Sequence, residues 1–82
     1  MQLPGWELKE GTLTKLYKFT DFKEAMAFVN RTAELAESMD HHPDILIQYN
    51  KVRLTLVTHS AKGLTEKDFR LAREIDAPEN PV

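Results

Sequence analysis

Residues 21–39, with the sequence DFKEAMAFVNRTAELAESM, carry apolar side chains at the spacing of an α-helix. These side chains recur every three or four positions and therefore share one helix face. Asp21 and Glu24 fit a capping box at its start. Pro43 disfavours helical geometry at His42, so we expect the helix to end near Asp40. The predicted apolar face, assigned to the core, consists of Phe22, Ala25, Met26, Val29, Ala33, Ala36 and Met39.

A β-hairpin is predicted on the N-terminal side of this helix. The segments GWELKE (5–10) and TLTKLYKFT (12–20) alternate apolar and polar residues, which indicates strands. Glu10 and Gly11 form the turn signal between them. Trp6 is expected either to pack on this hairpin or to anchor a partner chain.

A second hairpin is predicted on the C-terminal side. The segments ILIQY (45–49) and VRLTLVTH (52–59) alternate again and are rich in β-branched residues. Asn50 and Lys51 suit the turn between them. One face of the second strand carries Val52, Leu54 and Leu56.

The segment TEKDFRLAREI (65–75) returns to the helical period. Thr65 and Asp68 fit a capping box, and the predicted apolar stripe consists of Phe69, Ala72 and Ile75. The order ββαββα favours an α+β fold, with a four-stranded antiparallel sheet and two helices packed on one face. We expect one domain over residues 1–82, with a frayed tail at 77–82.

Composition narrows the classes of function. The chain has 82 residues with a formal net charge of −2, which argues against a broad basic surface for nucleic acid. It has no cysteine, so disulfides, thiolate nucleophiles and cysteine-ligated metals are excluded. The first residues lack a leader pattern, and no apolar run reaches membrane length. A cytoplasmic protein is therefore expected, with no membrane partner.

Two of the three histidines are adjacent, in MDHHPD (39–44). They follow the predicted helix, whose C-terminal partial negative charge favours imidazolium, a competent proton donor near neutral pH. Glu37 lies four residues before His41, so the two share a face if the helix extends that far. Pro43 is expected to hold both imidazoles in one orientation.

Simpler interpretations stand beside this one. A histidine near a helix C-terminus is often only a favourable cap, and Asp68 is accounted for by its capping box. His59 alone would be a surface residue, although a strand end that leads into a helix is a common place for a site. A metal site is disfavoured because the histidine spacings are not those of chelating pairs. The residues alone thus predict an α+β domain with a candidate histidine acid–base site.

Several segments together resemble the pterin-4a-carbinolamine dehydratase family: GW, AMAFVNRTAELAE, E-x-x-x-HHP, YNKVRLTLVTH and GLTEKD, in that order. The resemblance spans about residues 5–75. It implies dimers or tetramers of this α+β fold and the removal of water from 4a-hydroxy-tetrahydrobiopterin to give quinonoid dihydropterin. That reaction recycles tetrahydrobiopterin and requires no metal or other cofactor.

The resemblance also implies which residues form the site. Its catalytic set corresponds to His41, His42, His59 and Asp68, in which one imidazole acts as acid, another as base, and Asp68 orients His59. The substrate-binding positions that we expect are Glu37, Pro43, Thr58, Ser60 and Ala61. The expected partners are a small-molecule pterin and further copies of this chain.

An alternative is a non-catalytic pterin-binding or protein-assembly module on the same fold. It is motivated by Ile45 and Ser60, which stand where family members often have an aromatic and an acidic residue. Either function is compatible with self-association, since one sheet face and at least one edge strand are left open. Apolar side chains on both faces of the first hairpin favour a homodimer or homotetramer; they are Leu13, Leu16, Tyr17 and Phe19.

Overall fold

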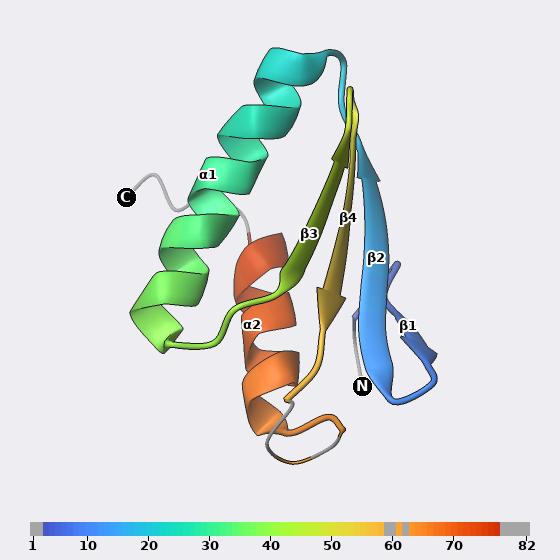
Figure 1. The fold of residues 1–82 in the computed structure, drawn as a ribbon, viewed down its shortest axis with the longest axis vertical. Coiled ribbons are helices and arrows are strands. Elements are labelled where there is room, and N and C mark those ends of the chain that lie inside the picture. The colour runs from blue at the N-terminus through green and yellow to red at the C-terminus, as the bar shows by residue number, and fades with distance from the viewer. Residues whose placement is uncertain (1–2, 59–60, 62, 78–82) are drawn as a thin grey trace.

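A four-stranded antiparallel sheet carries both helices on one face (Figure 1). The computed structural model describes residues 3–58, 61 and 63–77. The strand order is β1-β2-β4-β3, so β1 and β3 are the sheet edges. The predicted α+β class and the ββαββα order are confirmed. The elements are β1 (Glu7–Lys9), β2 (Thr12–Lys18), α1 (Phe22–Met39), β3 (Asp44–Gln48), β4 (Lys51–Leu56) and α2 (Glu66–Asp76).

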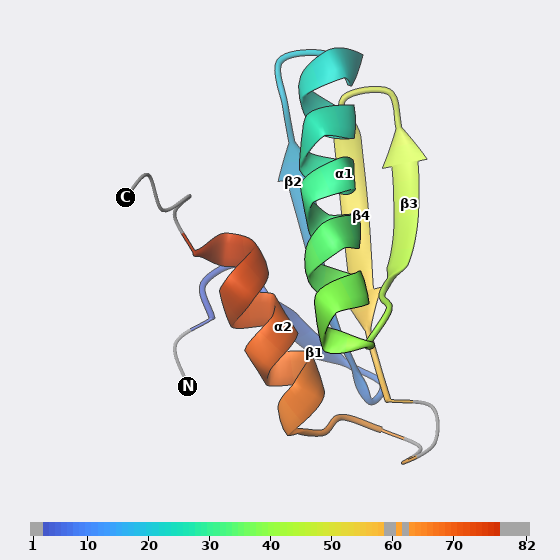
Figure 2. The ribbon, with the colours of Figure 1, turned by 90° about the vertical axis from the view of Figure 1, so that its left-hand side faces the viewer.

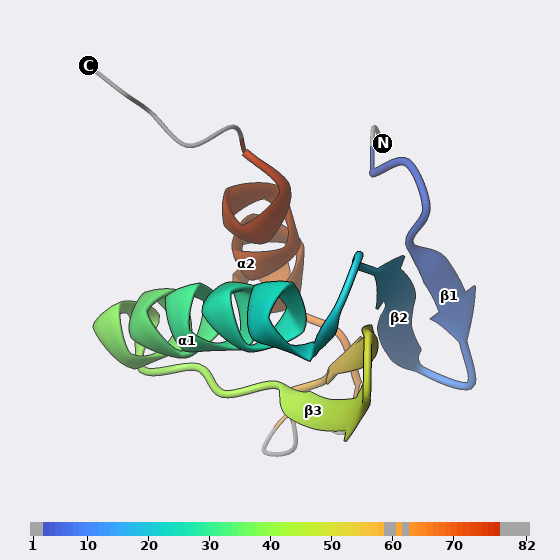
Figure 3. The ribbon, with the colours of Figure 1, turned by 90° about the horizontal axis from the view of Figure 1, so that it is seen from above.

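The core lies between the helices and the two central strands, as the view from above shows (Figure 3). The register places Leu13 of β2 opposite Leu56 of β4, and both side chains are fully buried. Alternation along β4 brings its other apolar residues to the same face, as the sequence predicted. The helices and β4 contribute the remaining central side chains: Val52, Leu54, Ala25, Val29, Ala36, Leu71, Ala72 and Ile75.

The buried face of α1 is rotated relative to the predicted one. Phe22 is 49% exposed and Ala33 is exposed, so assigning them to the core was wrong. Phe22 begins the helix, and the first turn of α1 lies beyond the strand tips (Figure 1). Thr32 instead is fully buried, with Phe28 and Leu35 packed at its side of the core. Both the predicted and the observed core positions fit the helical spacing of the sequence. Packing of α1 against α2 and β4 decides which of them are buried.

The two hairpin turns place backbone in the left-handed region. Glu10 and Gly11 have φ values of 51° and 78°, which is the combination that a two-residue turn needs to match strand twist. The second turn is Tyr49–Asn50 rather than the predicted Asn50–Lys51, because Gln48 pairs with Lys51. Asn50 joins this turn to the segment after β2. Its carbonyl accepts from the Phe19 N–H at 2.8 Å, and its side-chain amide donates to the Phe19 carbonyl at 3.0 Å. Tyr49, the first residue of this turn, takes the left-handed conformation, with φ 56°.

Helix α2 buries one residue that its predicted stripe omitted. Leu71 is fully buried with Ala72 and Ile75, while Phe69 is half-buried against the core.

Of the tail predicted to fray, residues 78–82 lie outside the described part. Within the described ranges, neither helix is long and apolar enough to cross a membrane.

Candidate active site

The backbone of His41 is fixed by the way α1 ends. Asp40 adopts a left-handed conformation with φ 51°. Its N–H donates to the carbonyl of Glu37 at 3.2 Å, and the N–H of His41 donates to the carbonyl of Ala36 at 3.0 Å. This pair of bonds is the Schellman motif, which satisfies the last carbonyls of a helix and turns the chain sharply. The predicted helix end at Asp40 is therefore confirmed, and His41 leaves the helix from a rigid position.

The side chain of His41 pairs with the first turn of α2. Its Nε2 lies 2.6 Å from Oδ1 of Asp68, and the end of α1 and the start of α2 lie toward the same end of the molecule (Figure 2). His41 is 9% exposed and Asp68 is fully buried. Asp68 also accepts from the N–H of Thr65 at 3.0 Å, the capping bond that the sequence predicted. One carboxylate thus caps a helix and binds an imidazole.

Asp68 is held in its charged form. Burial by itself would raise the pKa of this carboxyl, but hydrogen bonds from His41, Thr58 and the Thr65 N–H outweigh that effect and lower the pKa below its ordinary value. Its place in the first turn of α2 also suits a negative charge. A charged, buried carboxylate 2.6 Å from an imidazole is an arrangement that orients the ring.

The second histidine makes a separate and exposed pair. Nε2 of His42 lies 2.7 Å from Oε1 of Glu37, and the two side chains are 58% and 79% exposed. Glu37 therefore contacts His42 rather than His41, because α1 ends at Met39 and the helical i, i+4 relation does not reach His41. Two carboxylates on different helices hold the two imidazoles, so the expectation that Pro43 holds them in one orientation is wrong.

The remaining predicted site residues are placed as follows. Thr58 follows β4 and its hydroxyl donates to Asp68 at 2.7 Å. Ala61 is exposed, with its N–H bonded to the Thr58 carbonyl at 3.0 Å. Pro43 is half-buried beside His42 in the chain. His59 and Ser60 lie outside the described residues, so the expected pairing of Asp68 with His59 is a prediction that the structure does not test.

One member of the site was not predicted. The hydroxyl of Thr65 lies 2.8 Å from that of Thr58, whereas the sequence indicated Thr65 only as a helix cap. The spacing from Thr65 to Asp68 located the carboxylate, but no sequence signal joins either residue to His41, which lies 27 positions before Asp68. Among the described residues, no three His, Asp or Glu side chains are arranged to hold a metal ion.

The two pairs differ in what they can do with a proton. The His42–Glu37 pair is open to solvent and can exchange protons with water or a bound molecule. The His41–Asp68 pair is shielded, and Asp68 also accepts from the Thr58 hydroxyl and the Thr65 N–H, so the carboxylate that orients the ring is itself fixed. An exposed imidazole and a buried one, adjacent in the sequence and each with its own carboxylate, suit general acid–base chemistry.

The chain is similar over most of its length to a known protein family. The family described as pterin 4 alpha carbinolamine dehydratase matches residues 1–78. A protein of Thermomicrobium roseum named "Putative pterin-4-alpha-carbinolamine dehydratase" is 57% identical over 74 residues, which cover 90% of this chain and 80% of that protein. A protein of Acidobacterium capsulatum with the same name is 57% identical over 75 residues, covering 92% and 82%.

Two solved structures are similar to this fold. A transcriptional coactivator/pterin dehydratase from Brucella melitensis has a TM-score of 0.86 and 41% identity, over 89% of this chain and 80% of that one. A pterin dehydratase-like protein described as a RuBisCO assembly factor of the alpha-carboxysome has a TM-score of 0.71 and 25% identity, over 87% and 82%. With the family match over most of its length and relatives at 57% identity, this chain belongs to the pterin-4a-carbinolamine dehydratase family.

Proposed function

We propose that this protein is a hydro-lyase that converts 4a-hydroxy-tetrahydrobiopterin to quinonoid dihydropterin and water in tetrahydrobiopterin recycling. The observation that carries the proposal is the pair of histidine–carboxylate contacts at one end of the two helices, 2.6 and 2.7 Å long. Family membership supplies the class of substrate. The histidines supply imidazole nitrogens that can donate or accept a proton.

The reaction needs one proton delivered and one removed. The lone pair on pterin N5 expels the C4a hydroxyl as that oxygen is protonated, so the C–O bond breaks and a C=N bond forms. A base then takes a proton from the ring, which leaves the neutral quinonoid product and one water. We assign delivery to the exposed His42, which Glu37 supports, and removal to the fixed His41. Each well-placed group contributes about 10²–10⁴-fold.

Stopped-flow loss of 4a-hydroxy-tetrahydropterin, with and without protein, tests the activity. We expect micromolar protein to accelerate dehydration well beyond the spontaneous rate. His42→Ala should remove most of that acceleration. Lys23→Ala is the matched control, since Lys23 is exposed on the first turn of α1, at the opposite end from the histidines.

Circular dichroism of both variants separates loss of chemistry from loss of fold. A wild-type rate no faster than the spontaneous one would reject the dehydratase. A folded His42→Ala variant at the wild-type rate would reject the role assigned to His42 and leave the activity itself standing.

A second candidate function is a non-catalytic pterin-binding or protein-assembly module. It is favoured by one observation, the similarity at 25% identity to a pterin dehydratase-like protein described as a RuBisCO assembly factor. Titration of a pterin, followed by its fluorescence, separates the two functions. Tight binding without turnover would favour the module, and turnover would favour the enzyme.

Self-association also stays a proposal. The sheet face away from the helices carries Leu16 and Leu46, which are 41% and 51% exposed and stand on either side of Arg53 in the register. The outer edges of β1 and β3 have no strand partner among the described residues. We expect a homodimer or homotetramer, with sheet faces or edges in contact. Light scattering at low micromolar concentration tests this, and the mass of a single chain would contradict it.

A cytoplasmic location is likewise proposed.

A further inference from the structure

The carboxylate of Asp68 receives hydrogen bonds at both of its oxygens. Oδ1 accepts from Nε2 of His41 at 2.6 Å. Oδ2 accepts from the hydroxyl of Thr58 at 2.7 Å and from the backbone N–H of Thr65 at 3.0 Å. A further contact of 2.8 Å joins the hydroxyl oxygens of Thr58 and Thr65. These groups connect the end of α1, the segment after β4 and the start of α2.

The direction of each bond in this network follows from the chemistry of its members. A carboxylate only accepts, so the single hydroxyl proton of Thr58 lies toward Asp68. The Thr58 oxygen must then accept from the hydroxyl of Thr65. For the same reason, the proton between His41 and Asp68 lies on Nε2. Every proton in the chain therefore points toward the carboxylate.

We propose that Thr58 and Thr65 are positioning residues that hold Asp68 as the acceptor for Nε2 of His41. The neutral ring then keeps its proton on Nε2 and presents Nδ1 as the reactive nitrogen. Within the described part of the chain, no group is bonded to Nδ1. In the proposed dehydration Nδ1 is the atom that takes the ring proton. That catalytic consequence rests on the proposed function, whereas the tautomer does not.

The backbone N–H of Thr65 makes this arrangement directional. If Asp68 is replaced by Asn, the side chain has one oxygen and one NH2 group. The oxygen must face the Thr65 N–H, because an NH2 group there would set two donors against each other. The NH2 group is then directed at Nε2 of His41, which can accept only if the ring carries its proton on Nδ1. Asp68→Asn should therefore invert the tautomer of His41.

Long-range ¹⁵N–¹H spectra of the imidazoles test this without reference to activity. The His41 signals are assigned with His42→Gln and His59→Gln variants. They are read after the pH has been raised from about 6.5, the ordinary imidazole pKa, until titration shows a neutral ring. We expect the Nε2–H tautomer in the wild type and the Nδ1–H tautomer in Asp68→Asn. A wild-type ring protonated on Nδ1, or a variant that keeps Nε2–H, would overturn the proposal.

Kinetics test the contribution of the hydroxyl chain. Thr58→Val keeps the side-chain shape and removes the donor to Asp68, and it should lower kcat about tenfold with little change in KM. Thr58→Ser restores the donor and should recover the rate. Thr32→Val is the control, because it makes the same chemical change at a buried threonine whose hydroxyl has no partner among the described residues.

The outcomes separate this proposal from the proposed function. A protein with no dehydratase activity but with the expected tautomers would reject the enzyme and leave the network standing. An active protein in which Thr58→Val keeps the wild-type rate, or in which Thr58→Ser fails to recover a lost rate, would reject the positioning role. Equal losses in Thr58→Val and Thr32→Val would also reject it.

Discussion

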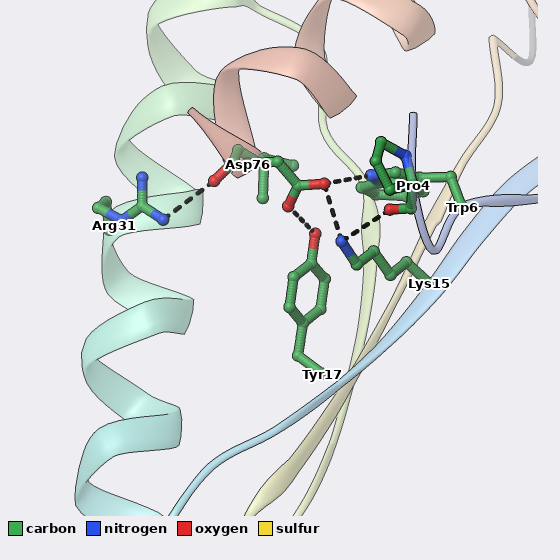
Figure 4. Close-up of polar contacts among 7 residues, drawn as sticks. Pro4, Trp6, Lys15, Tyr17, Arg31 and Asp76 are labelled. Atoms are coloured by element: carbon green, nitrogen blue, oxygen red, sulfur yellow. Dashed lines mark hydrogen bonds and ion pairs between the residues drawn. The ribbon is translucent and has the colours of Figure 1, made fainter. Parts of the chain in front are cut away.

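Helix α2 has an aspartate near each end. Each carboxylate accepts three hydrogen bonds, from three different kinds of donor. Asp68, in the first turn, binds an imidazole, a hydroxyl and a backbone N–H. Asp76, the last residue, accepts from the Trp6 indole at 2.7 Å, the Lys15 ammonium at 2.9 Å and the Tyr17 hydroxyl at 2.6 Å (Figure 4). Both carboxylates are satisfied, but only Asp68 has an imidazole among its described partners.

The charges and hydrogen bonds of the Asp76 cluster, which consists of Trp6, Lys15, Tyr17 and Asp76, indicate that it stabilises the fold. Burial would raise the pKa of Asp76, and bonds from Tyr17, Lys15 and Trp6 outweigh that effect and lower it. Burial first, and then the bond to Asp76, raise the pKa of the Tyr17 phenol. The lowered pKa keeps Asp76 charged, and the raised pKa keeps Tyr17 neutral, across the physiological range. The cluster joins the N-terminal segment and β2 to the end of α2, which settles Trp6 as a packing residue of the fold.

The end of α2 away from the candidate active site is also hollowed. A hollow of about 400 Å³ adjoins Asp76. Its polar side chains are already paired with one another or with Glu66, so it offers no proton-transfer group. Partner chemistry, rather than volume, therefore distinguishes the candidate active site. The lining residues of the hollow are Leu3, Pro4, Lys15, Arg73, Asp76 and Ala77.

The largest expected difference between the two aspartates is catalytic. Asp68→Asn should lower the dehydration rate by about 10²-fold or more, because it removes the charge that orients His41. Asp76→Asn should leave the rate close to that of the wild type, since its donors take no part in proton transfer. Stopped-flow rates of the two folded variants decide this, and similar losses would break the comparison.

The next effect concerns stability at the Asp76 end. Asp76→Ala leaves the donors on Trp6, Lys15 and Tyr17 without their acceptor and should lower the free energy of unfolding by about 1–3 kcal/mol. Glu66→Gln is the control, since the Arg73–Glu66 pair is exposed and contributes about 0–1 kcal/mol. Urea denaturation measures both. Equal effects would mean that the Asp76 cluster stabilises the fold no more than an exposed ion pair does.

The pH dependence of stability should have two limits with different origins. The pKa values of Asp68 and Asp76 are lowered by folding, so their contribution is present above about pH 4 and is lost as pH falls below it. The pKa of Tyr17 is raised, so its contribution is complete below about pH 10 and is lost as pH rises further. Tyr17→Phe should remove the alkaline loss and keep the acid one. Urea midpoints across the pH range would show an unchanged alkaline limit if this is wrong.

The smallest expected effect lies at the exposed pair. Glu37→Gln keeps an acceptor for His42 but removes the charge, so we expect a several-fold lower rate and a stability change within about 0.5 kcal/mol. Glu34→Gln makes the same chemical change about one turn earlier on α1, where the residue is also exposed. A rate loss of equal size in Glu34→Gln would show that general surface charge, and not the pair with His42, is responsible.

Local patterns were sufficient for the elements and for single residues at their ends. The helix period, the capping box at Thr65 and Asp68 and the turn at Glu10–Gly11 are each set by neighbours a few positions apart, so they could be predicted. It was harder to predict the phase of each element, that is, which residues of a helix face the core and which residues form a turn. The second turn and the rotation of α1 were predicted wrongly because several phases satisfy the same local pattern.

Which side chains meet depends on how the helices and strands pack together. His41 and Asp68 are 27 positions apart, and Trp6 and Asp76 are 70 apart. No local rule relates them, since each contact exists only because α2 packs beside α1 and the first hairpin. The left-handed turn at Asp40 then separates two adjacent histidines, burying His41 against Asp68 and leaving His42 exposed with Glu37. Sequence motifs were therefore enough to identify the family and to locate imidazoles and carboxylates at the ends of helices and strands, whereas packing determines how these groups pair.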